Sequence, residues 1–215
     1  MAEPSTPRAP ITISRKTAFV GLAAQGALFT TAGIGLWMFS GRAVADFLSV
    51  SVRDIGIGLA FAAALIGVAA VLFHGFPKMS ERLVRLQGDS YRFLGANLGW
   101  PAVVGISLVA GISEEAALRG GLQTWLGDAL GGPAAIVLSS ILFAAMHFAQ
   151  PLILALLFVI GLAFGVVYWQ TGSLLAVMIA HVLYDIWALR YLNREMQRLG
   201  LFDDPAPLAN PVGDG

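Results

Sequence analysis

Long stretches without charged side chains constrain this chain more than any other feature. Residues 17–39 contain no Asp, Glu, Lys or Arg, and none occurs between Asp128 and Asp185. An apolar segment of about 20 residues is long enough to cross a bilayer as a helix. The chain is 57% hydrophobic and only 12% charged, whereas a soluble domain has about 25% charged residues. We therefore expect an all-α polytopic membrane protein.

Turn signals divide the apolar sequence into about six transmembrane helices. Proline restarts a helix after Gly131-Gly132, Pro151 interrupts the next apolar run, and Thr171-Gly172-Ser173 makes a tight connection with Ser173 as a possible N-cap. Because the last four helices have short connections, we expect them to form a compact antiparallel core. The expected spans are residues 17–39, 55–76, 98–126, 133–149, 152–170 and 173–189.

The chain outside these spans is short and polar. The loop after the second helix places Met79, Leu83 and Leu86 along one side and charges along the other, so we expect it to lie on the inner membrane surface. The predicted organisation is a disordered lead at 1–16, two transmembrane helices at 17–76, this amphipathic loop at 77–97, a four-helix core at 98–190 and a tail at 191–215.

The positions of the basic residues predict the orientation. Lysines and arginines gather in the lead, in the amphipathic loop and in the tail, whereas Arg42 and Arg53 fall on the other side. Cytoplasmic loops carry the excess of Lys and Arg. We expect an inner-membrane protein of a bacterium, with both termini in the cytoplasm and the lipid bilayer as its surroundings.

Charge balance and the absence of cysteine exclude several classes of function. The 13 basic and 13 acidic residues cancel, so the net charge gives no reason to expect nucleic acid as a partner. With no cysteine in the chain, thiolate metal ligands and a cysteine nucleophile are excluded. The sequence leaves the oligomeric state open.

Against this apolar background, a few ionisable residues fall inside the predicted core helices. Placing a carboxylate or guanidinium at the bilayer centre costs about 3 kcal/mol even on the lenient insertion scale, so such residues are functional by default. Glu115 and Arg119 are four residues apart and share a helix face, whereas Glu114 is rotated away. We expect Glu115 to pair with Arg119. His147 follows on the fourth helix, and His181 and Asp185 share a face of the sixth.

Counting residues from the outer helix ends puts Glu114, His147, His181 and Asp185 at similar depths, toward the cytoplasmic half of the bilayer. A buried glutamate beside an imidazole is a usable general base. Taken singly, each residue also has a purely structural explanation: a packing ion pair, an interior histidine, or an acid–histidine contact between helices. Taken together, they favour a functional site.

These residues also form a recognisable pattern. Glu114-Glu115-Ala-Ala-Leu-Arg119, Phe143-Ala-Ala-Met-His147 and His181-Val-Leu-Tyr-Asp185 resemble the EExxxR, FxxxH and HxxxN/D motifs of the CAAX protease and bacteriocin-processing (CPBP, Abi) family. The resemblance covers about residues 98–190. It implies a glutamic-type intramembrane endopeptidase without a cofactor, acting on a membrane peptide or protein with or without an attached lipid.

The resemblance also implies roles for individual residues. Glu114 and His147 would activate a water, His181 and Asp185 would form the oxyanion side, and Glu115, Arg119 and Phe143 would support them. Where prenyl-protein members carry asparagine, this chain has Asp185, which would act either as a neutral hydrogen-bond donor or as an ionised partner of His181.

Two other functions remain open from the sequence. The same cavity would suit a non-catalytic scaffold or an immunity-type protein that binds a peptide. Alternatively, Glu114, His147 and His181 have the ligand types of an open zinc site in a hydrolase.

Overall fold

The computed structural model describes residues 15–202 as a bundle of helices. Five helical segments are long and apolar enough to cross a membrane, and their outer surfaces carry exposed large apolar side chains such as Leu28, Val71 and Val159. Such a surface needs lipid around it, so the chain is an integral membrane protein. The predicted lead lies largely outside the described residues, as does the end of the predicted tail.

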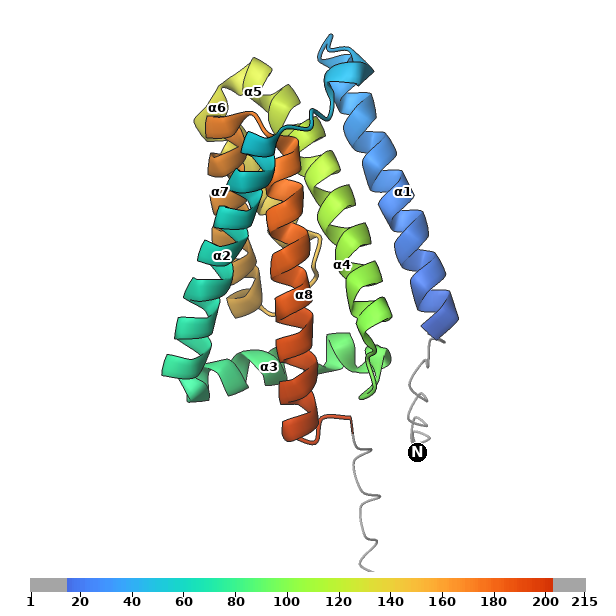
Figure 1. Cartoon of the computed structure of the whole chain (residues 1–215), viewed down its shortest axis with the longest axis vertical. Coiled ribbons are helices and arrows are strands. Elements are labelled where there is room, and N and C mark those ends of the chain that lie inside the picture. Colours follow the sequence, from blue (N-terminus) through green and yellow to red (C-terminus); the bar gives the residue numbers. More distant parts are fainter. Residues whose placement is uncertain (1–14, 203–215) are drawn as a thin grey trace, which may run out of the picture.

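The helices follow the predicted order (Figure 1). The first two, α1 and α2, are joined by a loop containing the short helix η1, and a helix across the foot of the bundle, α3, leads through η2 into α4. The elements are α1 Arg15–Phe39, η1 Val44–Asp46, α2 Val52–Gly75, α3 Pro77–Tyr91, η2 Arg92–Leu94, α4 Trp100–Glu115, η3 Ala116–Gln123, α5 Thr124–Leu130, α6 Gly132–Ala145, α7 Pro151–Thr171 and α8 Leu174–Arg198.

Local sequence explains where the helices begin. Proline occupies the first turn of α3, α4, α6 and α7, where its missing N–H costs nothing. The predicted N-cap at Ser173 is confirmed, since its hydroxyl accepts a hydrogen bond from the Ala176 N–H at 3.1 Å. Gly172, with φ +65°, ends α7 in the left-handed region that favours glycine.

The fourth expected transmembrane helix is present as α6 but is short. α6 has 14 residues, which at about 1.5 Å per residue gives roughly 21 Å, less than the roughly 30 Å of a bilayer core. The sequence predicted a helix to residue 149, but the α-helix ends at Ala145 and a turn follows. The prediction that His147 lies on this helix is therefore wrong. It failed because Met146 to Ala149 offers no helix-breaking residue.

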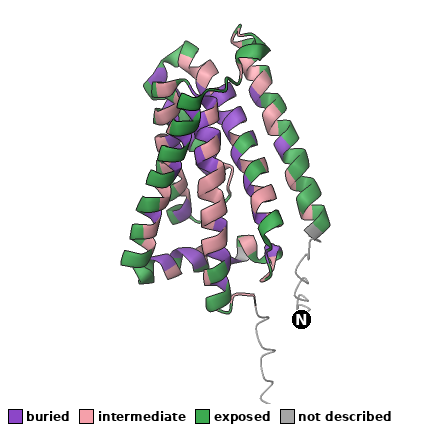
Figure 2. Ribbon diagram, viewed as in Figure 1, coloured by how far each residue is buried: buried purple, intermediate pink, exposed green. Residues whose placement is uncertain are grey.

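The first two helices pack onto the core. α2 runs along α8, and α1 runs along α4 and η3. Figure 2 shows that buried residues concentrate where α8 meets η3 and along α3, whereas α1 and α2 are largely exposed on their outer sides. α8 continues to Arg198, nine residues beyond the expected end of the last span at 189, so the first part of the predicted tail is helical.

The predicted amphipathic loop is the helix α3, which lies across the foot of the bundle (Figure 1). Its buried apolar side chains are Leu83 and Val84, and Val84 packs against Leu192 and Met196 of α8. Met79, expected on the same side as Leu83, is instead exposed. α3 therefore closes the foot of the bundle, in addition to any contact with the membrane surface.

Candidate active site

A π-helix positions the first motif. α4 ends at Glu115, and η3 continues the same rod as eight residues of π-helix, a rare geometry that is frequent at functional sites. Glu115, Arg119 and Gln123 follow one another at four-residue spacing and are each at most 1% exposed. No pattern in the sequence predicts this local widening of the helix. It turns three polar side chains toward α6, α7 and α8.

The predicted pair of Glu115 and Arg119 is confirmed, with Nη1 of Arg119 3.2 Å from Oε1 of Glu115. Nη2 of Arg119 also donates to the carbonyl oxygen of Gly161 at 3.0 Å. One turn further on, Nε2 of Gln123 donates to the carbonyl oxygen of Gly165 at 2.9 Å. Gly161 and Gly165 let α6 pack closely against α7, because Cβ atoms added at these glycines would meet α6 side chains at 3.0–3.2 Å.

Phe143 holds the Arg119 guanidinium from one side. The guanidinium carbon lies 5.1 Å from the ring centre of Phe143 and 5.6 Å from that of Phe164, which are cation–π distances. The Phe143 ring is also edge-on to His147, with centroids 5.0 Å apart. This residue of the second motif thus connects Arg119 with His147.

His181 lies among three carboxylates. Its Nδ1 is 2.8 Å from Oε1 of Glu115, and its Nε2 is 3.6 Å from Oδ2 of Asp185 and 4.0 Å from Oε2 of Glu114. The expected closeness of His181 and Asp185 is confirmed. The sequence missed the contact of His181 with Glu115, because it joins two helices far apart along the chain.

His147 lies in the turn between α6 and α7. Its Nδ1 is 2.8 Å from the carbonyl oxygen of Phe143, and since a carbonyl oxygen only accepts, Nδ1 carries the proton. In the neutral imidazole Nε2 is then an acceptor with a free lone pair. The next residue, Phe148, has φ +45° and is 93% exposed. A bulky side chain in this conformation marks local strain next to the imidazole.

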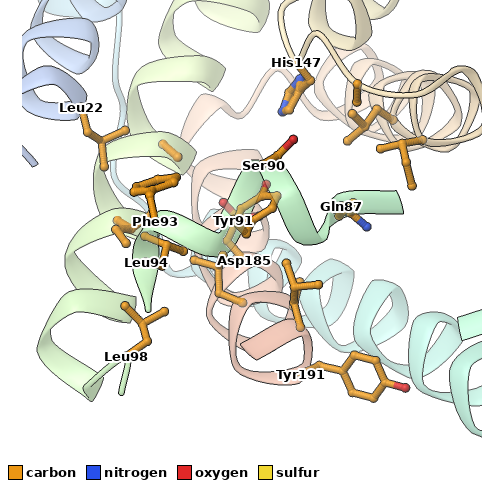
Figure 3. A pocket seen from close by; sticks show the side chains of 18 of the residues that line it. Leu22, Gln87, Ser90, Tyr91, Phe93, Leu94, Leu98, His147, Asp185 and Tyr191 are labelled. Carbon is orange, nitrogen blue, oxygen red and sulfur yellow. The ribbon is translucent and has the colours of Figure 1, made fainter. Parts of the chain in front are cut away.

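Glu114, His147 and Asp185 line one cavity of about 820 Å³ at the foot of the bundle (Figure 3). Irregular backbone at membrane depth is tolerated where it lines such a cavity. Apart from these three groups the walls are largely apolar, with side chains from α1, α3, α4, α7 and α8. Glu115 and Arg119 are not among the lining residues and are fully buried behind them. The first motif therefore divides into one carboxylate in the cavity and one buried ion pair.

Tyr91 and Tyr184 also line this cavity, and the sequence motifs identified neither. Tyr184 precedes Asp185 on α8, and Tyr91 is the last residue of α3. The amphipathic pattern of α3 was the available signal for Tyr91, but it was interpreted as a membrane-facing surface.

The three residues considered as zinc ligands do not form a ligand set. Among the side chains that the structure describes, no three His, Cys, Asp or Glu residues are grouped so as to hold a metal ion. Glu114 and His181 approach one another, while the Nδ1 of His147 is bonded to backbone.

Fold and site together define a class: a polytopic all-α membrane protein with acids and imidazoles gathered at an internal cavity. Residues 96–187 match the family model described as type II CAAX prenyl endopeptidase Rce1-like. Over this segment the chain is therefore similar to the Rce1-like family, whose description is that of an endopeptidase. The matched segment contains all three motifs.

One curated relative agrees over a longer stretch. The uncharacterized protein YpbD of Bacillus subtilis (strain 168) is 27% identical over 165 residues, covering 74% of this chain and 80% of the relative. No solved structure matches the chain.

Proposed function

We propose that the chain is a glutamic-type intramembrane endopeptidase, in which Glu114 and His147 activate the attacking water. The observation that carries this proposal is that both side chains line the same cavity, together with Asp185. The neutral His147 presents a free Nε2, because its Nδ1–H is bonded to Phe143. A carboxylate and an imidazole facing one water-accessible space are the groups that general-base hydrolysis needs.

The proposed reaction is simple hydrolysis. The water oxygen forms a bond to the scissile carbonyl carbon while its proton passes to the Glu114 and His147 pair, and the carbonyl oxygen becomes an oxyanion. The carbon–nitrogen bond then breaks, and the same proton passes to the leaving amine. No cofactor takes part in this scheme, since both proton transfers use side chains of the chain itself.

The buried groups would hold the reacting carboxylate in place. His181 is 6% exposed. Its Nδ1 contacts Glu115, and its Nε2 faces Glu114 and Asp185. Arg119 keeps a positive charge behind the three acids, which lowers the cost of burying them. In this scheme Asp185 stands on the oxyanion side of the cavity, and His181 orients it.

The substrate proposed is a membrane-associated peptide or protein, with or without an attached lipid. The largely apolar walls of the cavity and its position within a membrane bundle support this class. The cavity is floored by α3, which carries Lys78, Arg82 and Arg85. We place this end in the cytoplasm and the site toward the cytoplasmic half of a bacterial inner membrane.

The test compares membranes that contain the wild-type chain with membranes that contain Glu114→Gln. Mass spectrometry of newly formed protein termini should find cleavage products that depend on Glu114, because the amide has nearly the same shape but is no base. Equal amounts of both variants in the membrane control for folding. Identical termini in the two samples would contradict the proposal and favour a non-catalytic scaffold.

Two further experiments test whether the substrate needs a lipid and whether cleavage needs a metal. Peptides that span the cleavage site, with and without a farnesyl group, would show whether the lipid is required. Cleavage that survives a strong zinc chelator supports the scheme without a metal, whereas loss of cleavage that zinc restores would favour the zinc hydrolase.

A further inference from the structure

The proposed hydrolysis needs a hydrogen-bond donor that stabilises the oxyanion, and the residues assigned so far do not provide an obvious one. When water attacks, the carbonyl oxygen becomes an anion, and enzymes stabilise it with hydrogen-bond donors aimed at that position. Here the cavity wall carries the carboxylates of Glu114 and Asp185, which accept hydrogen bonds when ionised. A donor that does not depend on protonation of these acids must therefore come from another residue that lines the cavity.

The buried cations are committed elsewhere. Arg119 is fully buried, bonded to Glu115 and to the Gly161 carbonyl, and does not line the cavity. His181 is bonded through Nδ1 to Glu115, and its Nε2 faces Asp185 and Glu114. His147 uses its Nδ1–H on the Phe143 carbonyl. None of these N–H groups is placed to reach a substrate oxygen.

Tyr91 presents a hydroxyl at the right place. It is the last residue of α3 and lines the same cavity as Glu114, His147 and Asp185 (Figure 3). Its ring packs against two apolar clusters, which include Leu98 and Leu189 in one and Val84 and Leu192 in the other. The phenol is thus fixed from both sides by side chains of α3, α8 and the segment before α4.

The hydroxyl of Tyr91 is also chemically available. It forms no hydrogen bond to any side chain that the structure describes, unlike Tyr191, whose hydroxyl lies 2.7 Å from Oγ of Ser80. Burial raises the pKa of Tyr91 to about 12, and the nearby charges of Asp185 and Glu114 act in the same direction. A phenol with this pKa keeps its proton across the neutral range, so it remains a donor.

We propose that Tyr91 is a further catalytic residue, which donates its phenolic hydrogen bond to the scissile carbonyl oxygen as it becomes an oxyanion. This inference rests on the proposed proteolytic function. It gives α3 a second duty, because the helix that floors the cavity then also completes the site. No proton is transferred from Tyr91, so the hydrolysis balances as before.

The matched test replaces one hydroxyl at a time. Tyr91→Phe keeps the packed ring and removes the donor, while Tyr168→Phe removes a phenol outside the cavity lining, whose hydroxyl lies 2.9 Å from Oγ1 of Thr124. The substrate is an internally quenched peptide that spans the Glu114-dependent cleavage site. We expect Tyr91→Phe to lower kcat about 100-fold with KM nearly unchanged, as for other lost oxyanion donors, and Tyr168→Phe to leave kcat within a few-fold of wild type.

The pH profile separates this role from a structural one. With a pKa of about 12, the Tyr91 hydroxyl stays protonated from pH 6 to 9. Removing this hydroxyl should therefore lower the cleavage rate by the same factor throughout that range, without shifting the acidic or the basic side of the pH–rate profile. Wild-type kcat in Tyr91→Phe, or a rise in KM alone, would overturn the proposal. The proposal also fails if Tyr184→Phe, and not Tyr91→Phe, lowers kcat. Absence of any cleavage by the wild-type chain would overturn the proposed function as well.

Discussion

At the scale of single residues, two adjacent glutamates have opposite environments. The Glu115 side chain is fully buried, and one of its oxygens accepts from both Arg119 and His181. The Glu114 side chain is 13% exposed and lines the cavity. Because neighbouring residues on a helix point about 100° apart, a paired acid and a reactive acid fit side by side. The buried ion pair of Glu115 and Arg119 behind Glu114 limits how far the Glu114 carboxylate can move.

His147 allows a test at single-atom resolution. His147→Asn keeps an N–H near the position of Nδ1, so the bond to the Phe143 carbonyl survives, but it removes the acceptor at Nε2. We expect a folded protein with cleavage reduced by about 100-fold or more, the lower range for a lost general base. Cleavage of the quenched peptide and thermal unfolding in detergent measure the two effects. His147→Asn with wild-type cleavage would show that Nε2 takes no part.

At the scale of elements, the helix α6 decides where the site lies. Because α6 ends at Ala145, the turn that carries His147 is placed within the bundle, where it meets Phe143 and the cavity. If α6 continued to residue 149, the His147 imidazole would point in another direction around the axis of α6. The strained Phe148 shows that this turn is held by its surroundings.

Interactions within one helix were predictable from the sequence, and those between helices were not. Spacing of four residues was enough to pair Glu115 with Arg119, and apolar runs were enough to place the spans. The contact of His181 with Glu115, the end of α6 and the inward face of α3 depend on how helices pack, which no local pattern encodes. Tyr91 was missed for this reason, since the period of α3 fits a membrane surface and a cavity floor equally well.

The packing of α1 on η3 gives a prediction about two nearby glycines. A Cβ added to Gly33 would lie 2.2 Å from the carbonyl oxygen of Ala116, whereas one added to Gly35 would meet nothing within 4 Å. Gly33→Ala should force the two helices apart and lower the free energy of unfolding by about 1–3 kcal/mol. Gly35→Ala, on the same helix, should leave it unchanged or slightly higher.

Thermal unfolding in detergent, followed by tryptophan fluorescence, measures both variants. Because η3 carries Arg119 and follows Glu115 directly, Gly33→Ala should also reduce cleavage, whereas Gly35→Ala should not. Equal stability of the two variants would mean that the close approach of α1 to η3 does not occur in the membrane.

At the scale of the whole molecule, the two ends of the bundle differ in charge. α1 begins and α8 ends at the same end as α3 (Figure 1), and most lysines and arginines of the chain belong to these segments. At the other end, Arg42 is bound by Asp128 of α5, with Nη2 of Arg42 2.9 Å from Oδ1 of Asp128. This pairing reduces the positive charge of that end further. The asymmetry supports an orientation with α3 in the cytoplasm.

The absence of cysteine makes this orientation directly testable. Val50, in the loop before α2, is 73% exposed at one end, and Phe93, in η2 after α3, is 47% exposed at the other. In spheroplasts a membrane-impermeant maleimide should label Val50→Cys, while Phe93→Cys should be labelled only after the membrane is permeabilised. The wild-type chain, which has no thiol, is the blank. The reverse labelling pattern would place α3 and the cavity that it floors on the outer side, so that peptides from outside the cell would be the accessible substrates.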